Sequence, residues 1–381
     1  MGRLKIITFL FLIVSVFACD NDEPTPQTNS RTVLVYLAAN NSLSGYADLN
    51  IENMMQGAAN GNLNGGNFLI YLAPRNGVPQ LLRIRQDADG QIVKETIKTY
   101  PKQNSVSIDV MRNVITEVIT DFPATSYGLV LWSHGTGWLP SNVLSDDMLR
   151  SFGQDGQNWM ELNELAQALP DHQFNYILFD ACYMGSVEVA YALRAKTEYI
   201  LASPTEIMAD GMPYQLIVKD MFAETPGLKQ IAEKFYQFYD QKSGKGRSAS
   251  ISLINTAHMN ELAALTREIV QSNKEAINTL PLNVIQPLDY LGGTRYHAFY
   301  DYDDYITRLA TAEQAARFTK CLGDVIVYKA TTPKAYYSYG GNGLIVSINH
   351  FSGLSAYIPQ VNLTKLNSWY ESLDWYKAVY K

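Results

Sequence analysis

Two stretches of this sequence, Tyr127-Gly-Leu-Val-Leu-Trp-Ser-His-Gly135 and Tyr176-Ile-Leu-Phe-Asp-Ala-Cys182, decide its fold. Each begins with an apolar run that is typical of a buried β-strand, and each run stops at a chemically reactive side chain. Catalytic groups in a parallel α/β sheet lie where neighbouring strands end, at the carboxyl edge of the sheet. We therefore expect the imidazole of His134 to lie beside the thiol of Cys182.

Strand and helix patterns alternate on both sides of these two stretches. Strands are expected at residues 32–38, 68–73, 174–179 and 199–203, and helices at residues 46–55, 106–120, 159–169 and 184–194. Residues 80–86 and 91–99 flank Asp89-Gly90, a dipeptide that favours a β-hairpin turn. The alternation predicts an α/β fold in which helices cover both faces of a mostly parallel sheet.

The predicted domain organisation has four parts. Residues 1–18 form a signal peptide, residues 19–30 a flexible tether, residues 31–212 the α/β core, and residues 213–381 a C-terminal region of helices and strands packed on that core. In the last part, helices are expected at residues 228–241, 259–272, 311–327 and 366–380, and strands at residues 248–253 and 343–349.

The N-terminus has the pattern of a targeting segment. Arg3 and Lys5 precede an apolar stretch, residues 6–17, of the length found in signal peptides. The stretch ends at Val16-Phe-Ala-Cys19, which resembles a bacterial lipoprotein cleavage box in which Cys19 becomes the lipidated first residue. Residues 20–30 are acidic and Pro-rich, as expected for a tether, and their acidic start resembles a surface-export signal of Bacteroidetes lipoproteins.

We therefore expect an exported protein, anchored by lipid to a bacterial membrane, at the outer membrane or cell surface. The alternative is an ordinary secretory signal in which Cys19 lies near the cleavage point by chance.

Composition excludes several other classes of protein. The chain has 381 residues, of which 47% are hydrophobic, so it can form a large core, and its net charge of −7 without a basic cluster argues against nucleic-acid binding. No apolar run beyond the N-terminus is long enough to span a membrane. No zinc-binding helix or phosphate loop is present, and Asp87 and Asp89 lack the further ligands of an EF-hand calcium loop. We predict no cofactor.

The chemistry expected at the two strand ends is that of a cysteine nucleophile. A free thiol is a weak nucleophile at neutral pH, but a neighbouring imidazole can accept its proton. Cys182 also directly precedes the helix predicted at residues 184–194, whose N-terminus would favour a thiolate. The N–H groups of Gly135 and Cys182 are candidates for binding an oxyanion. Alternatively, Cys182 is a buried apolar side chain, or forms a disulfide with Cys321 that would abolish the chemistry.

At this point the sequence resembles a family, the clostripain-like cysteine peptidases, which are relatives of caspases, gingipains and legumains. The matching stretches are Leu131-Trp-Ser-His-Gly-Thr-Gly-Trp138 and Phe179-Asp-Ala-Cys-Tyr-Met-Gly-Ser-Val-Glu188, and weaker matches extend over about residues 31–381. The resemblance implies a caspase-like three-layer α/β/α sandwich. It also implies that His134 is the general base or acid and that Cys182 is the nucleophile.

The resemblance further implies cleavage after Arg or Lys. A buried cation needs a paired carboxylate. Asp180 matches the family position at the base of the pocket for the residue before the scissile bond (the S1 pocket), and Asp210 is a candidate second carboxylate. The alternatives are a structural acid for Asp180 and a turn residue for Asp210. The family usually has an acidic residue after the first strand, where this chain has Asn40-Asn41. Some members use calcium, although no loop here dictates it.

Arg150 is the only Lys or Arg between His134 and Cys182, and it lies in a polar, Gly-containing stretch that suits an exposed, easily cut loop. Family members mature by cleavage in this interval. Our hypothesis is that the chain is a zymogen activated by its own cleavage after Arg150; the alternative is an ordinary surface arginine.

The sequence as a whole predicts a lipid-anchored cysteine endopeptidase acting on proteins or peptides with a basic residue before the cleaved bond. Two alternatives stay open. One is a catalytically silent surface lipoprotein that keeps the peptidase fold and binds protein or peptide, and the other is a peptidase of non-basic specificity.

Overall fold

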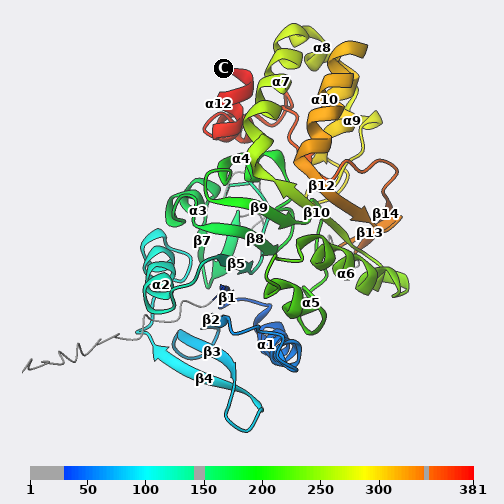
Figure 1. Cartoon of the computed structure of the whole chain (residues 1–381). Coiled ribbons are helices and arrows are strands. Elements are labelled where there is room, and N and C mark those ends of the chain that lie inside the picture. The colour runs from blue at the N-terminus through cyan, green and yellow to red at the C-terminus, as the bar shows by residue number, and fades with distance from the viewer. Residues whose placement is uncertain (1–29, 141–150, 339–342) are drawn as a thin grey trace, which may run out of the picture.

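A computed structural model of the chain describes residues 30–140, 151–338 and 343–381. Its main sheet is formed by β1 (Thr32–Ala39), β2 (Asn67–Pro74), β3 (Gln80–Gln86), β4 (Ile92–Thr99), β5 (Tyr127–Trp132), β8 (Phe174–Asp180), β9 (Thr197–Ala202), β10 (Ser250–Asn255) and β12 (Ile326–Thr331). The order across the sheet is β12-β10-β9-β8-β5-β1-β2-β3-β4 (Figure 1). The five central strands run parallel, and the two strands at each edge are antiparallel.

Helices cover both faces of this sheet. Side chains alternate between the faces of a strand, and on β1 Tyr36 packs in one core whereas Val35 and Leu37 pack in the other. The second core is closed by α1 (Ser44–Ala58), α5 (Tyr214–Met221) and α6 (Leu228–Asp240). The first core is closed by α2 (Ile108–Asp121), α3 (Leu162–Ala168), α4 (Val187–Ala192) and α7 (Met259–Ser272). The predicted three-layer α/β/α sandwich is confirmed.

Local hydrogen bonds move two helix starts away from their predicted positions. The helix expected from residue 159 begins at Leu162, because β7 (Asn158–Met160) pairs with β6 (Phe152–Asp155) and Glu161 then starts a capping box. The helix expected from residue 184 is α4, which begins at Val187 after Ser186 accepts a hydrogen bond from the N–H of Val189. The chain directly after Cys182 is therefore irregular.

The C-terminal region contributes to the same sheet through β10 and β12. Its further helices are α8 (Lys274–Thr279), α9 (Tyr302–Leu309), α10 (Ala312–Val325), α11 (Thr364–Tyr370) and α12 (Asp374–Tyr380), with short 3₁₀ helices at Gly244–Gly246, Thr256–His258 and Leu282–Val284. Two small ribbons pair β11 (Tyr300–Asp301) with β15 (Ser355–Ala356), and β13 (Lys334–Tyr337) with β14 (Leu344–Ser347).

In Figure 1 the helices α7, α8, α9, α10 and α12 gather at the end of the molecule opposite the β3–β4 hairpin. The single helix predicted at residues 366–380 is two helices. Within the described ranges, no helix has the length and apolar character needed to cross a membrane.

Candidate active site

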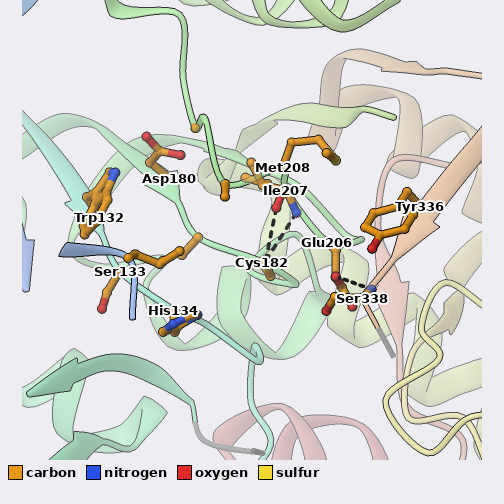
Figure 2. A pocket seen from close by; sticks show the side chains of 14 residues that line it. Trp132, Ser133, His134, Asp180, Cys182, Glu206, Ile207, Met208, Tyr336 and Ser338 are labelled. Atoms are coloured by element: carbon orange, nitrogen blue, oxygen red, sulfur yellow. Dashed lines mark hydrogen bonds between the residues drawn. The ribbon is translucent and has the colours of Figure 1, made fainter. Parts of the chain in front are cut away.

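The register of two neighbouring strands places the two reactive residues together. β5 and β8 lie side by side and parallel, and Trp132 at the end of one pairs with Asp180 at the end of the other. His134 and Cys182 each follow two positions later, so both emerge at the same edge of the sheet. Both line one cavity of about 290 Å³ (Figure 2). The sequence predicted this meeting from the strand ends alone.

His134 is oriented by a residue from a third strand end. Ser42, which follows β1, contacts Nε2 of His134 through its hydroxyl at 2.8 Å. Among the described residues no hydrogen bond joins His134 to Cys182. Burial lowers the pKa of His134 below its usual 6.5, so the imidazole is neutral at pH 7 and able to accept a proton.

The surroundings of Cys182 favour the protonated thiol. Burial, followed by the negative charge of Glu206, raises its pKa to about 12. The predicted support from a helix N-terminus is wrong, because α4 starts only at Val187. Instead the backbone N–H of Ile207, in the segment after β9, donates to Sγ at 3.3 Å. Cys182 and Cys321 are both free, which excludes the disulfide alternative.

Gly135 brings its backbone very close to the segment that carries the thiol. A Cβ at this position would lie 2.8 Å from the carbonyl oxygen of Cys182, so only glycine fits. Among the described residues, neither the N–H of Gly135 nor that of Cys182 donates a hydrogen bond to a backbone carbonyl. Both donors are thus available beside the thiol, as an oxyanion site requires.

Asp180 is a buried carboxylate in the wall of the same cavity. Its Oδ2 accepts hydrogen bonds from the N–H of Met212 at 3.0 Å and from the hydroxyl of Tyr214 at 2.9 Å. Burial raises the pKa of Asp180 to about 6, against the opposing effect of these two donors. Gly211 packs against the carboxylate, since a Cβ there would lie 2.7 Å from Oδ2.

Asp210 does not join Asp180 at the cavity. Its side chain is half exposed and pairs with Lys242 at 3.0 Å, while its neighbours Ala209 and Gly211 line the cavity wall. The prediction that Asp210 is a second pocket carboxylate is therefore not supported by its position, because its side chain points to Lys242, in the chain segment after α6.

The second carboxylate of the site is Glu206, which the sequence analysis missed. Its Oε1 accepts from the hydroxyl of Tyr183 at 3.1 Å. Its Oε2 accepts from the N–H of Ser338 at 2.9 Å (Figure 2). Glu206 also lines a second hollow, of about 370 Å³, that shares His134 and Cys182 with the first. One signal was available: Glu206 follows β9, the next parallel strand of the sheet, and so reaches the same edge.

Two asparagines occupy the place where the family usually carries an acid. Asn41 donates through Nδ2 to the carbonyl of Ala38 at 2.8 Å and to the hydroxyl of Ser133 at 3.2 Å. Asn40 donates to Oδ1 of Asp155 at 2.6 Å. The hydrogen bonds of these amides stabilise the segment before His134. This structural role does not require a metal.

The remaining predicted residues lie elsewhere. Asp87 accepts from the N–H groups of Asp89 and Gln91, so these residues form a hairpin turn. Within the described parts of the chain, no three His, Cys, Asp or Glu side chains gather in a metal-binding group. Arg150 and Cys19 lie outside the described residues.

Comparisons with known proteins agree with this geometry. A sequence model described as the clostripain family matches residues 35–381. A structure of an inactive zymogen C11 protease from Parabacteroides distasonis is 44% identical, with a TM-score of 0.85 over 93% of this chain and 99% of that one. A secreted C11 cysteine protease from Bacteroides thetaiotaomicron, in complex with an irreversible peptide inhibitor, is 35% identical, with a TM-score of 0.82 over 92% of this chain and 99% of that one.

A further secreted C11 cysteine protease from Bacteroides thetaiotaomicron, named iotapain, is 28% identical, with a TM-score of 0.81 over 93% of this chain and 100% of that one. No curated protein matches the chain. Three observations agree with one another: the thiol and imidazole at the strand ends, the α/β/α sandwich, and the family match over nearly the whole length. The chain therefore belongs to the clostripain family of cysteine peptidases.

Proposed function

We propose that this peptidase cleaves peptide bonds after Lys or Arg. The observation that carries the proposal is the carboxylate of Asp180, buried in the wall of the cavity that also holds Cys182. Among the described residues it forms no ion pair, so a substrate cation would supply the missing charge. Leu43, Trp132 and Met208 give the cavity apolar walls along which the methylenes of a long basic side chain can pack.

In the proposed mechanism His134 removes the proton of Cys182 as Sγ attacks the substrate carbonyl carbon. The N–H groups of Gly135 and Cys182 bind the oxyanion, and His134 then gives its proton to the leaving amine. Water deprotonated by His134 hydrolyses the resulting thioester and restores the thiol. Because the resting pKa of the thiol is high, proton transfer to His134 must accompany substrate binding or attack.

Fluorogenic peptides that differ only in the residue before the reporter group test this proposal. Lys and Arg peptides should be hydrolysed by the wild type and not by Cys182→Ala, and the uncharged norleucine peptide should be a poor substrate. Asp180→Asn keeps the size of the side chain and should selectively reduce turnover of the basic peptides. Equal turnover of the norleucine and basic peptides would contradict the proposed specificity.

We also propose that cleavage after Arg150 activates the enzyme. The residue that would become the new N-terminus, Ser151, is buried, and its carbonyl accepts a hydrogen bond from the N–H of Thr136 at 2.8 Å. This hydrogen bond places Ser151 beside Thr136, which is two positions after His134 in the chain. Intact-mass measurement of wild type, Cys182→Ala and Arg150→Gln is the test: a wild type that stays uncut while fully active contradicts the idea.

Lipidation of Cys19 is the third proposal, and it rests on the sequence pattern alone. The full-length chain expressed with a lipoprotein export system should enter the detergent phase on Triton X-114 partitioning, and Cys19→Ala should remain in the aqueous phase. Recovery of both proteins in the aqueous phase would indicate an ordinary secretory signal.

A further inference from the structure

Only one oxygen of the Asp180 carboxylate is open to a ligand. A carboxylate oxygen accepts hydrogen bonds along two lone-pair directions. Oδ2 already accepts two, from the N–H of Met212 at 3.0 Å and from the hydroxyl of Tyr214 at 2.9 Å. Oδ1 accepts none among the described residues, and Asp180 lines the cavity. A cation that enters the cavity therefore meets Oδ1 alone.

The arrangement around Oδ2 is fixed by buried structure. Tyr214 is fully buried at the start of α5, and Met212 is 1% exposed. Gly211 lies so close that a Cβ there would stand 2.7 Å from Oδ2 and 2.9 Å from Oδ1. Turning the carboxylate to present both oxygens would break two buried hydrogen bonds and collide with this backbone.

Glu206, the other acid among the described residues that line the cavity, is held beside the thiol by two hydrogen bonds. Each oxygen of Glu206 already accepts a hydrogen bond, one from Tyr183 and one from Ser338. The carboxylate of Asp210 is outside the cavity and paired with Lys242. At Asp180 the pocket thus offers one open oxygen, Oδ1.

From this geometry we propose that the pocket selects lysine over arginine at the position before the cleaved bond. A guanidinium is planar and binds carboxylates best through two parallel hydrogen bonds, one to each oxygen. An ammonium is a compact charge that needs only one oxygen in line with it. Arginine would lose one of its two charge-assisted bonds at Asp180 and leave further N–H groups unpaired. The inference rests on the proposed cleavage after basic residues.

Peptides identical except for Lys, Arg or norleucine before the reporter group test it on the processed enzyme. We expect kcat/KM for the Lys peptide to exceed that for the Arg peptide by about tenfold, the order expected for one lost charge-assisted hydrogen bond. Equal values, or a preference for Arg, would overturn the selectivity while leaving the proposed function intact. Efficient cleavage of the norleucine peptide would instead overturn the proposed function.

Tyr214→Phe tests the cause. This variant removes one donor from Oδ2 and opens a second site for a guanidinium, so the Lys-to-Arg ratio should fall several-fold. Tyr239→Phe is the matched control, because its hydroxyl donates to the carbonyl of Gly211 at 2.6 Å rather than to Asp180. An unchanged ratio in a folded Tyr214→Phe protein would overturn the argument. If that variant fails to fold, the wild-type ratio alone decides.

Discussion

Ser42 is an exposed side chain whose only described hydrogen bond is with the ring of His134, at 2.8 Å. We predict that Ser42→Ala lowers kcat by about tenfold with little change in KM, because the ring loses the contact that orients it while the substrate pocket is untouched. Steady-state kinetics with a Lys peptide would measure this. Ser44→Ala, two positions along the same segment, is the control; a matching loss there would contradict a positioning role for Ser42.

Asp180 should make the use of basic substrates depend on pH. Burial raises its pKa to about 6, so the carboxyl group is neutral below that pH and ionised above it. A cationic substrate is attracted only by the ionised form, so kcat/KM for the Lys peptide should fall about tenfold per pH unit as the pH drops below 6. Once bound, the cation favours the carboxylate, and the corresponding fall in kcat should move to lower pH.

The control for this pH profile is Asp180→Asn assayed with the same peptide. In that variant kcat/KM should no longer show the fall below pH 6 that protonation of Asp180 causes in the wild type. If variant and wild type share the same acid limb, another group is responsible for it.

Glu188 links the helix α4 to the C-terminal region. It is buried, and its Oε1 accepts from the N–H of Tyr357 at 2.9 Å and from the hydroxyl of Tyr370 at 3.3 Å. Its Oε2 is buried without a partner among the described residues, and burial raises the pKa of Glu188 to about 7. The carboxylate form is thus poorly accommodated where α4 meets the C-terminal region.

Replacing Glu188 should change stability in a pH-dependent way. Between pH 4.5 and 7 the unfolded chain releases this proton while the folded chain keeps it, so folding stability falls as pH rises through that window and levels off above pH 7. Glu188→Gln mimics the protonated form and avoids this loss, which amounts to a few kcal/mol. Melting temperatures at pH 5 and pH 8 would show whether the advantage of the variant grows with pH; a constant difference contradicts the prediction.

The elements that the sequence predicted well are those with an uninterrupted pattern. Each parallel strand is a run of apolar residues buried on both faces. Because catalytic groups lie at the carboxyl ends of such strands, the strand ends then located His134 and Cys182. β12 was missed, because it is an edge strand with half-exposed side chains, and Val327 continued the apolar spacing of the preceding helix. The early start predicted for α4 failed for a different reason, since Ser186 caps the helix through its own side chain.

The side chains of the pocket were less predictable than the nucleophile. Asp210 and Glu206 both lie in the segment after β9, where no periodic pattern reports the direction of a side chain. Lys242, in the chain segment after α6, pairs with Asp210 and holds it outside the cavity. Tyr183 and Ser338 donate hydrogen bonds to Glu206 and hold it beside the thiol. These partners are distant in sequence, so only the folded molecule distinguishes the two acids.

The two parts of the chain on either side of residues 141–150 are interleaved throughout the molecule. β5 from the first part pairs with β8 from the second, and α1 packs against α5. Trp138 is fully buried, with its ring 4.9 Å from that of Tyr357 and 5.1 Å from that of Tyr370. None of these contacts involves a residue of the 141–150 segment.

We therefore predict that the cut protein stays in one piece. A site for an unrelated protease placed within residues 141–150 of the Cys182→Ala chain allows controlled cutting. The product should elute as a single species of unchanged size on native size-exclusion chromatography and give two bands under denaturing conditions. The uncut protein with the same insertion is the control, and separation of the fragments without denaturant would contradict the prediction.

The pairing of β5 with β8 has a consequence for the lifetime of a cut molecule. While the chain is whole, the two strands are tethered and their meeting is an intramolecular event. After a cut between Pro140 and Ser151 the same pairing joins two separate polypeptides, so recovery from unfolding becomes second order and fails at high dilution. The cut enzyme would then persist only as long as it avoids unfolding, and its working life would be set by a rate and not by an equilibrium.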